Sequence, residues 1–116
     1  MKNYDLEERT IKFSKNIINL CKEIPFNMIN KRLIDQLLRS ATSIGANYRE
    51  ANECDTKKDF KNKIRIAKKE ARETIYWIEL LIDGNFGMKG EILPLLDESK
   101  QLIKILASIY LKTIDK

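Results

Sequence analysis

Histidine and valine are absent from this sequence of 116 residues, and glycine and proline occur only four times and twice. Without histidine there can be no histidine general base, no Ser–His or Cys–His nucleophile, and no histidine-containing zinc or di-iron site. A glycine-rich phosphate loop is also missing. We therefore expect a protein that is not an enzyme and that holds no cofactor. The scarcity of helix breakers predicts long, uninterrupted helices.

Cysteine and long apolar runs are scarce as well. The two cysteines, Cys21 and Cys54, share no metal-type spacing, and a single pair does not make a disulfide framework. The longest apolar stretch, residues 75–82, is interrupted by Glu79 and is far shorter than the roughly 20 residues that span a bilayer. We therefore expect a cytoplasmic protein with two reduced thiols and no membrane partner.

What the chain does contain is apolar residues that recur every three or four positions, which is the pattern of amphipathic helices. This pattern predicts helices over about 5–23, from 27 or 30 to 53, 57–83 and 91–114. The residues expected to face the core are Leu6, Thr10, Phe13, Ile17, Leu20 and Ile24; Leu33, Leu37, Ala41, Ile44, Tyr48 and Ala51; Phe60, Ile64, Ala67, Ala71, Thr74, Ile78 and Leu81; and Leu95, Leu102, Leu106, Ile109 and Thr113.

Capping residues and breakers mark the helix ends. Thr56 is the expected N-cap of the third helix, with Asp59 at the third helical position. Gly84 is expected to follow that helix in a left-handed conformation and to open a loop over 84–90. Pro94 is expected in the first turn of the fourth helix, where a missing N–H costs nothing.

Short connections between these segments require neighbouring helices to run in opposite directions. The sequence thus predicts an all-α fold, a single domain over residues 1–116 built as an antiparallel up-down-up-down four-helix bundle. Small side chains around Gly45 predict a close approach of a second helix there.

The basic charge is concentrated in the third predicted helix. Residues 57–72 contain eight basic and two acidic residues, a net charge of +6, whereas the whole chain carries only +5. Five cations at helical spacing share one face about 100° from the apolar seam, where we expect them to be exposed to solvent. These five, the basic stripe, are Lys57, Lys61, Arg65, Lys68 and Arg72. Such a row can meet successive phosphates of RNA or DNA, and it can equally be an ordinary solvated helix face.

Apolar side chains are more numerous at the end of the third helix and in the fourth helix than one stripe can bury. Surplus apolar surface favours a subunit interface. The residues predicted to form it are Tyr76, Trp77, Ile103 and Tyr110.

A structural ion pair is expected between the two middle helices. Counted from the turn at residues 54–55, Arg39 lies level with Glu70, and Glu73 is one turn further along. We therefore expect Arg39 to pair with Glu70 or Glu73 at a partly buried site and to fix the register of the hairpin.

Three stretches together resemble a known family. They are YDLEERTIKFSKNII at the start, LIDQLLRSATSIGANYREANE over 33–53, and KKDFKNKIRIAKKEARETIYWIELL over 57–81. This pattern is similar to the 23S rRNA intervening-sequence protein family, small bacterial four-helix bundles related to the accessory variability determinant of diversity-generating retroelements. The matching residues are Gln36, Arg39, Ser40, Ala41, Ser43, Ile44, Asn47 and Glu50, then Asp59, Phe60, Lys63, Ile66, Ala67, Lys69, Glu70, Glu73, Tyr76 and Trp77.

The resemblance implies the bundle fold and no catalytic residue. It also suggests a homo-oligomer, since the retroelement relatives form pentameric barrels that associate with nucleic acid and with a reverse transcriptase. Two hypotheses for function follow. The chain is either a self-associating, ring-forming protein that binds nucleic acid non-specifically through the basic stripe, or an oligomeric protein-binding scaffold with no nucleic-acid role.

Overall fold

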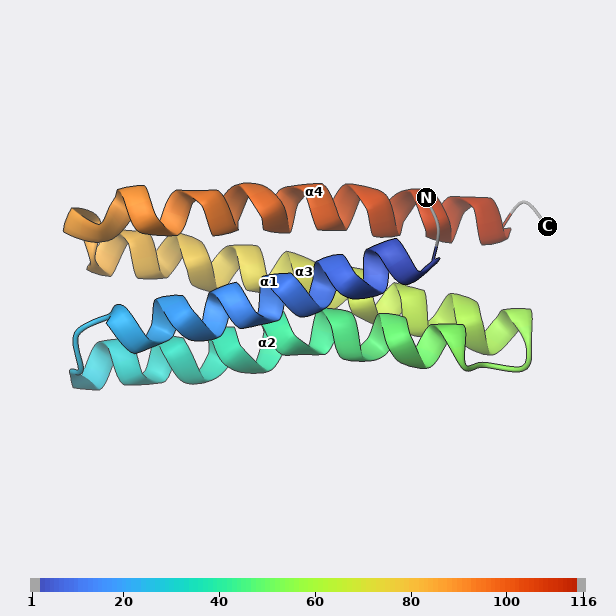
Figure 1. Cartoon of the computed structure of the whole chain (residues 1–116), viewed down its shortest axis with the longest axis horizontal. Helices are drawn as coiled ribbons and strands as arrows, with labels where there is room; N and C mark the ends of the chain where they lie inside the picture. The colour runs from blue at the N-terminus through green and yellow to red at the C-terminus, as the bar shows by residue number, and fades with distance from the viewer. Residues whose placement is uncertain (1–2, 115–116) are drawn as a thin grey trace.

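The computed structural model describes residues 3–114, which form four long α-helices (Figure 1). They are α1 (Asn3–Glu23), α2 (Met28–Asn52), α3 (Lys57–Gly84) and α4 (Lys89–Ile114), with a short 3-10 helix, η1 (Phe86–Met88), before α4. Consecutive helices run in opposite directions, and the described part of the chain contains no strand. The predicted antiparallel bundle is therefore confirmed, as a rod 47 Å long and about 21 by 20 Å across.

The starts of α2 and α3 are capped by side chains. The Asn27 carboxamide oxygen accepts a hydrogen bond from the backbone N–H of Asn30 at 2.8 Å. The Thr56 hydroxyl accepts one from the N–H of Asp59 at 3.1 Å, as the sequence predicts. Both caps satisfy a backbone donor that has no partner within its own helix.

The end of α3 differs from the prediction. Gly84 is the last residue of the helix, and no glycine among residues 3–114 has a positive φ. The helix is closed by Asn85, whose backbone N–H donates to the carbonyl of Ile82 at 3.2 Å. Since this bond needs no left-handed residue, the predicted role of Gly84 is wrong, and the predicted loop is a single 3-10 turn.

Pro94 also lies elsewhere than expected. Because α4 already begins at Lys89, the proline is inside the helix, past its first turn. Its missing N–H leaves the carbonyl of Gly90 without its usual helical partner. Gly90 is exposed, so water can reach that carbonyl.

Most residues that were expected to face the core are buried in the structure. All six predicted residues of α1 and its end are buried, as are most of those on the other helices, whereas Leu33, Phe60, Ile109 and Thr113 are half-buried. Ile92, Leu96 and Ser99 are buried on α4 in addition to the predicted set.

The predicted close approach at Gly45 is confirmed. A Cβ atom added there would lie 2.9 Å from Oγ1 and 3.0 Å from Cβ of Thr10 on α1. The missing side chain thus lets α1 lie against the middle of α2. In Figure 1, α1 stops short of the end at which α2 turns into α3.

Candidate nucleic-acid interface

The basic stripe runs along one face of α3. Lys57, Arg65 and Arg72 are exposed, whereas Lys61 and Lys68 are half-buried. At 1.5 Å per residue, the row extends over about 22 Å of helix axis. Since α3 begins where α4 ends (Figure 1), the first half of the stripe lies beside the last turns of α4.

An aromatic ring from α4 lies within this stripe. The ammonium groups of Lys61 and Lys68 are 5.4 and 4.7 Å from the centre of the Tyr110 ring. The expectation that all five cations are fully solvated is therefore wrong for these two, because α4 packs on that flank of α3. Periodicity within one helix cannot reveal this contact. The turn around Gly87 offers a signal, because Tyr110 follows Gly87 by as many residues as Ile64 precedes it. Antiparallel pairing about that turn therefore places Tyr110 level with the part of α3 that lies between Lys61 and Lys68.

Among the described residues, no carboxylate neutralises a charge of the stripe. Within residues 3–114, the ion pairs involve none of the five stripe cations. Lys63, which lies off the stripe, pairs with Glu50 at 2.7 Å, and its hydrogen bond to that carboxylate raises the Lys63 pKa. Arg65 donates to the side-chain oxygen of Asn62 at 3.0 Å, a neutral partner that leaves its charge intact. Within the described part of the chain, the stripe thus keeps its positive charge.

A shallow cleft of about 270 Å³ opens beside Tyr110. Its walls carry cations, neutral and acidic polar groups and the aromatic ring, supplied by Lys58, Asp59, Lys61, Asn62, Arg65 and Tyr110.

The four residues predicted to form a subunit interface differ in their exposure and contacts. The Tyr76 ring is 55% exposed and meets the Trp77 ring edge-on, with 5.0 Å between the ring centres. The Trp77 side chain is half-buried, and its indole N–H donates to Glu73 at 3.2 Å. Ile103 is half-buried against the core, and Tyr110 lies with the lysines of the stripe. Of the four, only Tyr76 offers a largely exposed side chain.

Arg39 on α2 reaches both carboxylates considered for it on α3. Its Nη1 lies 3.2 Å from Oε1 of Glu70, and its Nη2 contacts Oε1 of Glu73. The arginine side chain is 46% exposed, more than either carboxylate. Because Glu73 also accepts from Trp77, one carboxylate connects α2 to the indole ring. This arrangement links α2 and α3 without leaving a cation for a ligand.

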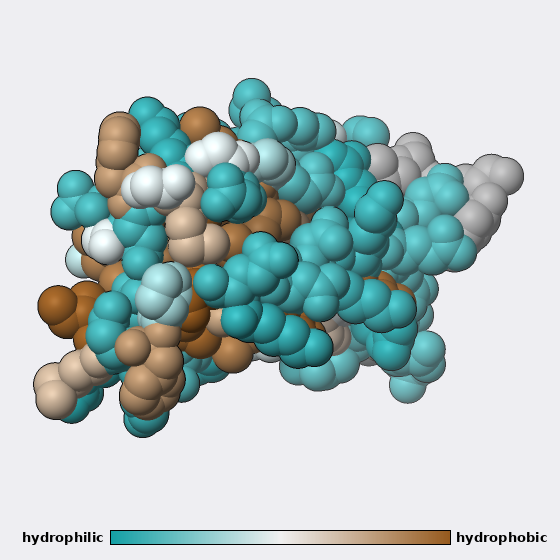
Figure 2. Space-filling model, turned by 60° about the vertical axis from the view of Figure 1, so that its left-hand side comes forward, coloured by the Kyte–Doolittle hydropathy of each residue, from teal (hydrophilic) through white to brown (hydrophobic). Residues whose placement is uncertain are grey.

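An exposed apolar end is a feature that helical periodicity did not reveal. Phe26, Met28, Ile29 and Phe86 are each more than two-thirds exposed. They lie near the turns from α1 to α2 and from α3 to α4, which share one end of the rod (Figure 1). Figure 2 shows brown side chains gathered at this end, on the left of the view. The available signal was a group of apolar residues in the turns and at the start of α2, outside the predicted core-facing positions.

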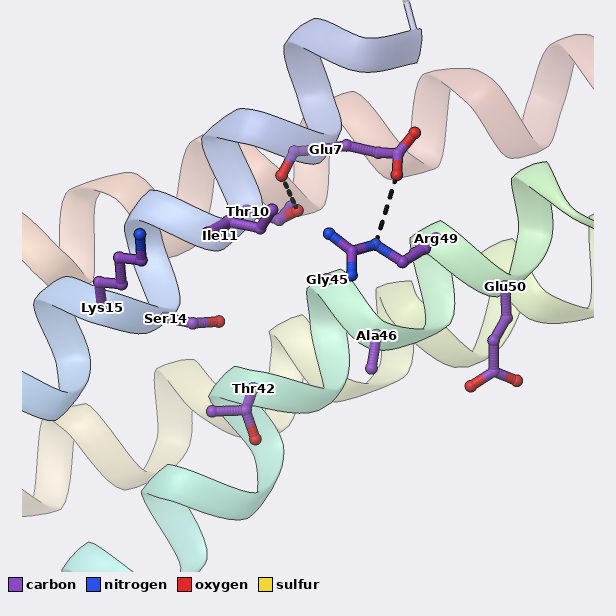
Figure 3. Close-up of a pocket in the computed structure, with 10 residues that line it drawn as sticks. All are labelled: Glu7, Thr10, Ile11, Ser14, Lys15, Thr42, Gly45, Ala46, Arg49 and Glu50. Atoms are coloured by element: carbon purple, nitrogen blue, oxygen red, sulfur yellow. Dashed lines mark hydrogen bonds and ion pairs between the residues drawn. The ribbon is translucent and has the colours of Figure 1, made fainter.

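A larger groove of about 410 Å³ lies between α1 and α2 (Figure 3). Small residues line it, namely Thr10, Ser14, Thr42, Gly45 and Ala46. Arg49 at its rim is 3.5 Å from Glu7, so this cation is already paired. The groove therefore lacks the concentration of unpaired charge found on α3.

Two kinds of feature are absent from residues 3–114. No group of three potential metal-ligating side chains gathers in this part of the chain. None of its helices combines the length and apolar character that a membrane span requires.

Comparison with known proteins agrees with the fold. Residues 2–108 match the family described as 23S rRNA-intervening sequence protein. A crystal structure from Bacteroides thetaiotaomicron, described as a protein with unknown function from the S23 ribosomal protein family, is 38% identical in sequence. The match covers 90% of this chain and 96% of that one, with a TM-score of 0.79. No curated protein sequence matches the chain.

Proposed function

The chain belongs to the 23S rRNA-intervening sequence protein family, and we propose that this member binds nucleic acid without catalysis, through the basic stripe on α3. The observation that carries the proposal is the row of five cations whose charges remain unpaired within residues 3–114. A row of this kind contacts the phosphate backbone and releases counterions. Because backbone contacts position a protein but carry no base information, the binding is non-specific in sequence.

The test is a filter-binding experiment with a long and a short oligonucleotide at two salt concentrations. The triple variant Lys61→Glu, Arg65→Glu, Lys68→Glu reverses the middle of the stripe. A matched control, Lys12→Glu, Lys15→Glu, Lys22→Glu, makes the same charge change on exposed residues of α1. We expect the stripe variant to lose binding and the control to keep most of it. Equal losses in both variants would show that net charge, and not the stripe, is responsible.

We also propose that the chain assembles with copies of itself, as a ring such as a pentamer. The support is the exposed apolar surface of Tyr76 and of the end formed by Phe26, Met28, Ile29 and Phe86, because such surface is uncommon on monomeric proteins. In a ring the stripe repeats on every subunit, so a long strand binds more tightly than a short one through effective concentration.

Light scattering tests the assembly. We expect a mass well above that of the 13.6 kDa chain at micromolar concentration, and a lower mass for Tyr76→Lys. A monomer under these conditions would contradict the ring. An assembled protein that binds no nucleic acid would instead favour a protein-binding scaffold.

A further inference from the structure

Tyr110 gives the basic stripe something that a row of cations lacks, namely a planar ring. Its side chain comes from α4 and reaches the middle of the stripe on α3. The adjoining cleft of about 270 Å³ is also lined by Lys61, Arg65 and Asn62. Aromatic side chains set among cations are the usual platform on which proteins stack the bases of single strands.

The lysines over the ring do not prevent such stacking. Lys61 and Lys68 are only half-buried, and a lysine ammonium ends a flexible four-carbon stem that can move its charge without moving the helix. A cation–π contact at an exposed site is weaker than base–aromatic stacking. When a base displaces the ammonium groups, each can contact a phosphate on either side of that base.

We infer that Tyr110 stacks on a nucleobase, so that the basic stripe prefers single-stranded to double-stranded nucleic acid. The inference rests on the proposed function, since it requires the stripe to hold the phosphates. The bases of a duplex are already stacked on one another and offer only their edges in the grooves. A single strand can turn a base face towards the ring while its backbone follows the stripe.

The experiment compares a labelled single strand, as DNA and as RNA, with a hairpin duplex of equal phosphate count, at low salt by fluorescence anisotropy. For Tyr110→Leu we expect a loss in affinity for the single strand of roughly five- to 150-fold, the range typical of one stacked base. The duplex affinity should change by less than about twofold, because the cations remain. Tyr110→Phe keeps the ring and should bind the single strand like the unmodified protein.

Leu111→Ala is the matched control. Leu111 follows Tyr110 on α4, and its side chain is 60% exposed. We expect this variant to bind both nucleic acids normally. Thermal unfolding of each variant shows whether it has kept its fold, and Tyr110→Phe supplies the comparison if Tyr110→Leu has not.

The outcomes separate this inference from the proposed function. If Tyr110→Leu binds the single strand normally, or weakens single strand and duplex equally, the stacking role is overturned. If the stripe variant Lys61→Glu, Arg65→Glu, Lys68→Glu loses binding at the same time, the proposed function still stands. If the unmodified protein binds neither nucleic acid at low salt, both fail.

Discussion

Asn30 and Asn85 exchange side-chain hydrogen bonds across one end of the bundle, with N···O distances of 3.0 and 2.8 Å. Asn30 is only 2% exposed and also donates to the carbonyl of Pro25, while Asn85 donates to that of Leu81. The two amides therefore join the α1–α2 turn to the end of α3. They hold together the turns that carry the exposed apolar residues.

Replacing Asn30 with alanine should destabilise the fold. The substitution leaves the Asn85 amide and the Pro25 carbonyl without these partners, and an unsatisfied buried polar group costs about 1–3 kcal/mol. We expect the free energy of unfolding in urea to fall by that amount. The control Asn19→Ala, at an exposed position of α1, should change it by less than about 0.5 kcal/mol. Similar values for both variants would show that the amide pair adds no stability.

Two glycine substitutions should differ in their effect on the stability of the fold. Gly45→Ala places a methyl group 2.9 Å from the Thr10 hydroxyl, and overpacking of this kind costs about 1–3 kcal/mol. The gain from removing a helical glycine, up to about 1 kcal/mol, does not offset that cost. In contrast, nothing lies within 4 Å of a Cβ atom at Gly90, so Gly90→Ala should be neutral or slightly stabilising. Thermal melting of the two variants measures the difference, and a stabilised Gly45→Ala would contradict the close approach of α1.

The contacts of Arg39 predict that two substitutions at this position lower the free energy of unfolding by different amounts. Arg39→Ala should lower the free energy of unfolding by about 1 kcal/mol, since the site is partly exposed and solvent screens the charges. Arg39→Met should cost less, because it keeps a long apolar stem in the same place. Both should also change the fluorescence of Trp77, whose N–H donates to the carboxylate that Arg39 contacts. If both variants unfold with the same free energy as the unmodified protein and leave the Trp77 fluorescence unchanged, the ion pair has no structural role.

Burial makes Cys21 a slow nucleophile. It raises the pKa of the Cys21 thiol from its ordinary 9.0 to about 11. The reactive thiolate is therefore about 100-fold scarcer near pH 8 than in an unfolded chain. We expect iodoacetamide to modify Cys21 much more slowly in the folded protein than in urea, as followed by mass spectrometry of its peptide. Rapid modification without urea would contradict the burial.

The same pKa sets a pH dependence of stability. The folded state holds the Cys21 proton more tightly than the unfolded state does. The contribution of this proton to the free energy of unfolding is therefore complete below about pH 9. The contribution is then lost as the pH rises from 9 through about 11. A Cys21→Ala variant should lack this component of the alkaline loss of stability.

The sequence predicted the fold well because the relevant information is local. In α1, each expected inward position from Leu6 to Leu20 is buried, since spacing alone decides which face of a helix meets the core. The predictions for Gly84 and Pro94 were wrong because a connection between two helices can adopt several local backbone conformations. A 3-10 turn closed by Asn85 avoids the left-handed glycine and lets α4 begin earlier than the proline suggested.

The candidate site was predictable only in part. The basic stripe is visible because its five positions belong to one helix. The place of Tyr110 depends on which flank of α3 is covered by α4, and no pattern within a single helix contains that relationship.

The most direct test of the central claim is the slope of the logarithm of the binding constant against the logarithm of salt concentration. If all five stripe cations contact phosphates, the slope should be roughly −3.5 to −4.5 per subunit engaged, from about 0.7 to 0.9 for each phosphate. The variant Lys61→Glu, Arg65→Glu, Lys68→Glu should flatten the slope by at least about 2, whereas Lys12→Glu, Lys15→Glu, Lys22→Glu should leave it nearly unchanged. An equal slope for the stripe variant and the unmodified protein would show that nucleic acid does not bind along this face of α3.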